Sequence, residues 1–195
     1  MITIPIGIDC GTADYLKRNN IRQLSLPFDW CVTYNGITDI VKNNFSNFLP
    51  TNNLSISNSS YTSYTSFVHN IFPADIDTMN RRIKRFMDLL STKDEELIFI
   101  KKGHANHNHS EALNLGCQIK NDIVDCEEFY LFLQNNYPKL KFKIMCIINC
   151  SQCFDCDKIY TSNFENMTIY NIITENTMID MEKFEKVLSI LLQAI

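Results

Sequence analysis

The 195 residues suffice for one compact domain with a hydrophobic core, and apolar (45%) and charged (21%) fractions of this size exclude a disordered or fibrous chain. The net charge of -4 has the wrong sign for a surface that follows phosphates, so nucleic acid is not an expected partner. No apolar stretch approaches the roughly 20 residues that span a bilayer, and the eight cysteines are expected to be reduced thiols of a cytoplasmic protein with no membrane partner.

The first part of the chain is predicted to begin with a strand that runs into a helix. Ile2–Ile8 is a β-branched run that ends just before Cys10, and Thr12–Asn20 has the pattern of a short helix. The apolar segment Leu24–Val32 contains a proline and is expected to pack without regular structure. The apolar spacing of Ile37–Phe48 predicts a second helix.

The next segment, Pro50–Ser66, is almost wholly Ser, Thr, Asn and Tyr, and it is expected to form an exposed loop. The remaining elements alternate, with strands predicted at Phe67–Phe72, Leu97–Ile100, Phe142–Ile148 and Met167–Ile173, and helices at Ile76–Leu90, Ser110–Asn136 and Met181–Ala194. This alternation predicts a single α/β domain over residues 1–195, with a mostly parallel sheet of about five strands and helices on both faces.

Cys10 is the first candidate for chemistry. In parallel sheets, functional sites lie beyond the carboxyl ends of the strands, and Cys10, His69 and residues 103–109 all follow predicted strands. A thiol between a strand and a helix can be activated by the amides that begin the helix, which suits a nucleophile. The alternative is that Cys10 is a small apolar side chain of the core, as many free cysteines are.

A nucleophilic cysteine needs a base, and the chain has four histidines. His69 lies among apolar residues and either faces a cleft or is satisfied in the core. His104, His107 and His109 lie in a polar segment where solvated side chains are the simplest expectation. Asp29 is an acid within an apolar segment, so it needs a partner there, and it either orients a catalytic histidine or caps a turn.

Two other groups of residues have more than one interpretation. Cys150, Cys153 and Cys156 have the tight spacing of soft zinc ligands, but the two separated pairs of a structural zinc site are missing, so reduced surface thiols are the alternative. The arginines within Arg81–Arg85 either form a solvated helix face, or one of them pairs with Asp29 or with a substrate anion.

Three motifs also resemble a known family. Gly7–Cys10 has the form Gly-x-x-Cys, Ser25–Trp30 has the form Ser-x-Pro-Phe-Asp-Trp, and Phe67–His69 has the form Phe-x-His. Together they resemble the signature of an uncharacterised family described as "putative papain-like cysteine peptidases", over most of residues 4–148. The resemblance implies that Cys10 is the nucleophile and His69 the base, with a papain-like α+β fold as the alternative architecture. Asn70 stands where the pattern leads us to expect an acidic residue.

Two functions follow as expectations. The first is a cysteine-dependent hydrolase of an acyl or isopeptide bond in a protein or peptide substrate, with Cys10, His69 and Asp29 in the site, an oxyanion held by the amides of Cys10–Thr12, and no cofactor or metal. The second is a catalytically silent binding protein, such as a viral effector, that uses Pro50–Ser66 for partner contact.

Overall fold

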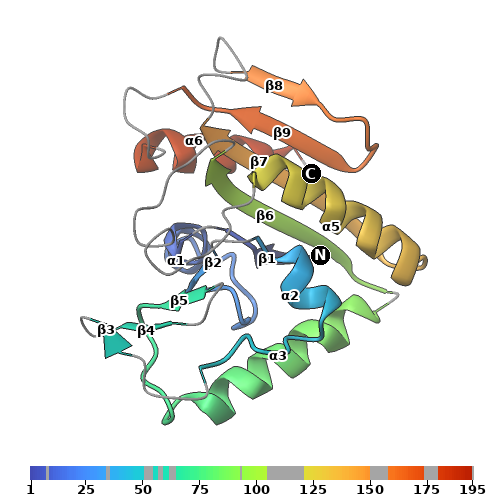
Figure 1. Cartoon of the computed structure of the whole chain (residues 1–195). Helices are drawn as coiled ribbons and strands as arrows, with labels where there is room; N and C mark the ends of the chain where they lie inside the picture. The colour runs from blue at the N-terminus through green and yellow to red at the C-terminus, as the bar shows by residue number, and fades with distance from the viewer. Residues whose placement is uncertain are drawn as a thin grey trace.

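The main sheet of the computed structural model has five strands in the order β1-β6-β7-β9-β8 (Figure 1). The structure describes residues 1–7, 9–33, 36–50, 55–56, 59–61, 65–92, 94–104, 121–149, 158–173 and 180–194. Neighbouring strands are parallel except for the last pair, β9 and β8. The strands are β1 (Ile2–Pro5), β6 (Glu96–His104), β7 (Lys141–Asn149), β8 (Lys158–Thr161) and β9 (Met167–Asn171). This mostly parallel sheet confirms the predicted α/β class over the α+β alternative.

Helices cover both faces of this sheet. Successive residues of a strand point to opposite faces, so neighbouring residues of β6 show which helices pack on each face. Ile98 and Ile100 pack with Leu16 of α1 (Gly11–Arg18) and Phe184 of α6 (Met181–Gln193). Phe99, between those two isoleucines, belongs to the cluster on the other face. That cluster includes side chains of α2 (Thr38–Lys42), α3 (Ile76–Leu90) and α5 (Asp122–Asn136). None of the described helices is long and apolar enough to cross a membrane.

A second, antiparallel sheet lies beside the first and has the order β2-β5-β4-β3. Its strands are β2 (Val32–Thr33), β3 (Ser55–Ile56), β4 (Ser59–Tyr61) and β5 (Thr65–Phe67). The expectation of an exposed loop over Pro50–Ser66 is therefore wrong for the described part of that segment, and Thr65 and Ser66 are buried. Residues with hydroxyl groups are typical of loops, but threonine is also common in strands. Here the described parts of the segment form strands because they pair with one another and with β2.

The helix predicted over Ile37–Phe48 ends at Lys42, because the following residues turn into the left-handed region. Asn44, Phe45 and Asn47 have φ values of 50°, 59° and 60°. Asparagine tolerates this conformation, whereas a bulky residue such as Phe45 adopts it only when its surroundings hold it there. The Phe45 ring is packed against three other aromatic rings, those of Phe28, Phe48 and Phe86. The apolar periodicity thus marks buried residues correctly, although a turn rather than a helix presents them.

Predicted helix Ile76–Leu90 is confirmed residue for residue as α3. The helix predicted from Ser110 is described from Asp122 onward, with Asn121 as its cap, and residues 105–120 lie outside the described part. The Asn121 side chain accepts hydrogen bonds from two backbone amides of the first turn, which satisfies donors that a helix start otherwise leaves unpaired.

A buried lysine joins β6 to α5. Lys101 has no exposed surface, and its Nζ lies 2.9 Å from Asp122 Oδ1 and 3.4 Å from Asp125 Oδ2. Burial by itself lowers the pKa of a lysine, yet the two carboxylates outweigh it and raise the pKa of Lys101. Asp125 also accepts hydrogen bonds from the backbone amides of Ile37 (2.9 Å) and Thr38 (3.1 Å). The short helix α2 is therefore held at its start by a side chain of α5.

Candidate active site

Cys10 lies where the sequence predicts it, between the end of β1 and the start of α1. It is the residue that precedes the helix, with φ −75° and ψ −6°, and its carbonyl accepts the first helical hydrogen bond from Asp14. Among the four cysteines of the described part, Cys31, Cys126 and Cys146 are buried and Cys10 is partly exposed. The surroundings of Cys10 thus differ from those of the cysteines that serve as apolar core residues.

An ion pair stands next to Cys10. Asp9 accepts a hydrogen bond from the Gly11 amide at 2.8 Å through Oδ1, and its Oδ2 lies 2.6 Å from Lys102 Nζ. Lys102 is buried and also lies over the ring of Phe184. Sequence reasoning missed Lys102 because the predicted strand ended at Ile100. A lysine at the carboxyl end of a buried strand is the signal that the sequence holds for Lys102, although it does not indicate the pairing with Asp9.

These charges and the partial burial of the thiol determine its protonation. The pKa of Cys10 is raised above its ordinary value, first because burial disfavours the thiolate and then because Asp9 is negatively charged. The backbone amide of Cys10 and the Lys102 ammonium oppose this rise, since both stabilise the thiolate. Cys10 therefore rests as a thiol at neutral pH and needs a base to become a nucleophile.

His69 lies in the turn after β5 and is exposed, so it is not a core histidine. The strand before it belongs to the small antiparallel sheet, which corrects the expectation that His69 follows a strand of the parallel sheet. Its ring contacts Trp30 edge to face, with 5.5 Å between the ring centroids. Within the described residues, no hydrogen bond joins the His69 ring to the Cys10 thiol.

Asp29 is completely buried and pairs with Arg22 rather than with His69. Its Oδ2 also accepts a hydrogen bond from the Leu26 amide at 2.9 Å, and its Oδ1 has no hydrogen-bond partner within the described part of the chain. Burial raises the pKa of Asp29, whereas the Leu26 amide and Arg22 lower it. The Arg22 guanidinium lies 5.6 Å from the centroid of the Trp30 ring, so Asp29 is linked to His69 through two intervening side chains.

The arginine-rich helix α3 faces the same carboxylate. Arg82 is partly buried and interacts electrostatically with Asp29, and Arg85 Nη1 donates to the Ser25 carbonyl at 2.5 Å. Arg82 thus lies within electrostatic range of Asp29, but the ion pair of that carboxylate is with Arg22, and Arg81 and Lys84 are exposed as a solvated helix face.

Changing Asp29 to asparagine is expected to lower the free energy of unfolding by about 1–3 kcal/mol, because the part-buried Arg22 loses its anion. Urea denaturation followed by the fluorescence of Trp30, the single tryptophan, would measure the change. Asp88→Asn is the matched control, since Asp88 forms an exposed pair with Lys84 on α3, and a shift below about 0.5 kcal/mol is expected. Equal midpoints for the two variants would contradict this role of Asp29.

The remaining candidates are the other three histidines and the three closely spaced cysteines. His104 is the last residue of β6 and lies opposite Asn149 of β7. His107 and His109, like Cys150, Cys153 and Cys156, lie outside the described residues. Within the residues that the structure does describe, no three His, Cys, Asp or Glu side chains are grouped so that they could hold a metal ion.

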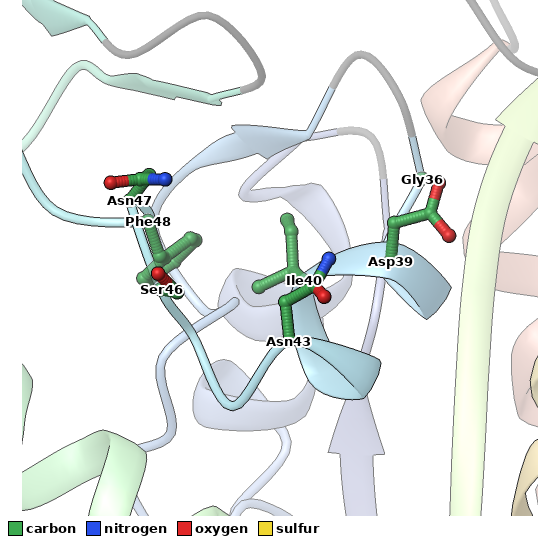
Figure 2. A pocket seen from close by; sticks show the side chains of 7 residues that line it. All are labelled: Gly36, Asp39, Ile40, Asn43, Ser46, Asn47 and Phe48. Carbon is green, nitrogen blue, oxygen red and sulfur yellow. The ribbon is translucent and has the colours of Figure 1, made fainter.

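A small hollow of about 160 Å³ lies between α2 and the turn that follows it, away from these candidates. None of Cys10, His69 and Asp29 lines it. Figure 2 shows the carboxylate of Asp39 directed away from Ser46 and Asn47 on the other side of the hollow. The polar groups of the hollow therefore do not converge on one point. Its lining consists of Gly36, Asp39, Ile40, Asn43, Ser46, Asn47 and Phe48.

A family model matches the segment of the chain that contains Cys10, Asp29 and His69. Residues 2–75 match the model of a family described as "Putative papain-like cysteine peptidase". This confirms the resemblance seen in the sequence, over a shorter stretch than the motifs suggested. No curated protein and no solved structure matches the chain. The peptidase family match thus covers β1, Cys10, α1 and the segments that carry Asp29 and His69.

Proposed function

We propose that the protein is a cysteine-dependent hydrolase in which Cys10 attacks the carbonyl carbon of an acyl or isopeptide bond. The observation that supports this most is the position of Cys10. It is partly exposed, it follows a strand of the parallel sheet and begins a helix, and it lies within the peptidase family match. The carboxyl edge of a parallel sheet is where α/β enzymes place their reacting groups.

Cys10 rests as a thiol, so the mechanism needs a base. We assign this role to His69, which lies within the same family match. The imidazole takes the Sγ proton as the sulfur attacks, and the electron pair of the C=O bond moves to the oxygen. When the oxyanion collapses, the leaving nitrogen takes the proton from His69 and a thioester remains on Cys10. Water then hydrolyses the thioester and restores the thiol. The edge-to-face contact with Trp30 restricts the rotation of the His69 ring, which supports a fixed position for the base.

The structure restricts the donors for the oxyanion. The Gly11 amide donates to Asp9, so it is engaged inside the protein. Thr12 has no exposed surface, so we assign the oxyanion to the amide of Cys10, just before α1. The ammonium of Lys102 adds positive charge near Cys10, and its ion pair with Asp9 partly offsets that charge.

The alkylation rate of Cys10 by iodoacetamide, measured against pH by mass spectrometry, tests the environment assigned to the nucleophile. Asp9→Asn is expected to shift the pH profile downward, because it removes a negative charge that raises the pKa of Cys10. Lys102→Met is expected to shift it upward, because it removes a positive charge that lowers that pKa. Cys31, which is buried, serves as the internal control and should label only after unfolding.

Profiles that coincide in the wild type and both variants would contradict the assigned charges. The same measurement in His69→Ala separates the two candidate functions. A slower reaction in this variant supports the hydrolase, in which His69 assists the thiol. An unchanged reaction favours the silent binding protein. The observation that supports this second function is that no hydrogen bond joins Cys10 to His69 within the described residues.

A further inference from the structure

A second hollow lies at the far end of α1 from Cys10, with a volume of about 320 Å³. The end of α1 and the segment after it form its walls. Gln23 is already engaged, since its amide donates to the Met1 carbonyl at 2.9 Å and accepts from the Thr3 amide at 3.3 Å. It therefore fixes the wall against β1. The lining residues are Lys17, Asn20, Arg22, Gln23, Leu24 and Ser25, and we call this hollow the Lys17 hollow.

Arg22, which lines this hollow, has N–H donors that no described residue accepts. Its Nε donates to the Leu24 carbonyl at 3.2 Å, and its Nη2 donates to the Ser25 hydroxyl at 2.8 Å and to Asp29. Within the described residues, the two hydrogens on Nη1 have no acceptor. A guanidinium carries five N–H donors, so two remain for a ligand.

Lys17 adds a second positive charge. It is exposed, it has no ion pair with any described residue, and its Nζ lies 5.8 Å from the centroid of the Trp30 ring. Arg82 interacts electrostatically with Arg22 and Arg85, and Asp29 is the carboxylate near both Arg22 and Arg82. Asp75 also faces Arg82, but it is engaged with the Ile71 amide. The Lys17 hollow is therefore locally positive on a protein of net charge -4.

The position of the hollow relates it to Cys10. Lys17 lies seven positions after Cys10, so both residues are on the same face of α1. A rise of about 1.5 Å per residue separates them by about 10 Å along the helix axis. An extended peptide covers that distance with about three residues, at about 3.3 Å per residue.

We propose that the Lys17 hollow binds a carboxylate of a peptide, held by the free donors of Arg22 and by the Lys17 ammonium. Resting on the proposed hydrolase function, this makes the peptide a substrate with an acidic group about three residues from the bond that Cys10 attacks. Arginine and lysine are the side chains that recognise carboxylates most strongly, and the partly buried position of Arg22 strengthens the interaction.

The single tryptophan lies beside both cations, so its fluorescence reports binding directly. The titration uses full-length protein with Cys10→Ala, which prevents cleavage, and acetylated, amidated hexapeptides that contain one glutamate or one glutamine. The glutamate peptide is expected to change the emission and to bind more weakly as salt rises, whereas the glutamine peptide has no effect. A glutamine peptide with a free C-terminal carboxylate distinguishes a terminal from a side-chain carboxylate, and inorganic phosphate tests for general anion binding.

Lys17→Gln is expected to weaken binding of the glutamate peptide about fivefold. Lys84→Gln, a change of an exposed lysine on α3, is expected to leave it unchanged. Equal binding of the glutamate and glutamine peptides, no response to any peptide, tighter binding of phosphate than of the peptides, or unchanged affinity in Lys17→Gln would each overturn the proposal. Because the readout is binding, the result of this test does not depend on whether the protein proves to have hydrolytic activity.

Discussion

Changing Lys101 to methionine is expected to destabilise the protein by about 3–5 kcal/mol, because it removes the buried ammonium that lies within 3.4 Å of both Asp122 and Asp125. Methionine fills much of the same volume, so the loss reports charge rather than a cavity. Asp125 also holds the start of α2, and the effect therefore extends to the segment around Ile37 and Thr38. Urea denaturation at neutral pH measures the change in the free energy of unfolding.

Lys143→Met is the matched control on the neighbouring strand β7. Lys143 is partly exposed, with a 3.5 Å pair to Glu96, and its loss is expected to cost less than about 1 kcal/mol. Adding Asp122→Asn to the Lys101 variant should recover part of the lost stability, since one of the two buried negative charges is removed. A Lys101 variant as stable as the control would show that the cluster is not an ion pair in solution.

Changing Cys10 to alanine is expected to abolish hydrolysis, with a loss of at least about 10³-fold, because alanine has no sulfur with which to form the thioester. The measurement is cleavage of a fluorogenic peptide library, with folding checked by circular dichroism. Cys31→Ser is the control. Cys31 is buried, its sulfur donates to the Pro27 carbonyl at 3.6 Å, and a hydroxyl can keep that contact.

The Cys31 variant should retain activity after correction for the folded fraction. Equal activity of the Cys10 variant and the wild type would refute the thioester mechanism. Activity of the wild type on none of the peptides would favour the silent binding protein, provided that the alkylation of Cys10 is also independent of His69.

The sequence was sufficient to predict the local part of the candidate site. A β-branched run, a polar junction and a helical pattern placed Cys10 between a strand and a helix, and the structure has this order. The partnership of Asp9 and Lys102 was out of reach, because it joins residues 93 positions apart. Parallel pairing of β1 with β6 creates it, and parallel pairing leaves no signal in either segment alone.

Other differences have physical causes of the same kind. Asp29 was correctly expected to need a partner, but the sequence offered several cations and could not select Arg22. His69 was placed on the rim of the parallel sheet because its strand was assigned to that sheet, whereas β5 pairs with β2 and β4. The helix predicted through Phe48 failed at three left-handed residues, since periodicity reports burial and not backbone conformation.

The pairing of β1 also determines how the chain can be divided. In the described sheet β1 pairs with β6 alone, and the start of α2 depends on Asp125, so residues 2–75 require contacts from residues 96–125. We therefore expect that the segment that matches the peptidase family does not fold by itself. A fragment that ends at residue 75 would expose one edge of β1 and leave α2 uncapped, and α2 is far shorter than helices that persist alone in water. The end of the family match at residue 75 is thus not expected to be the end of a folding unit.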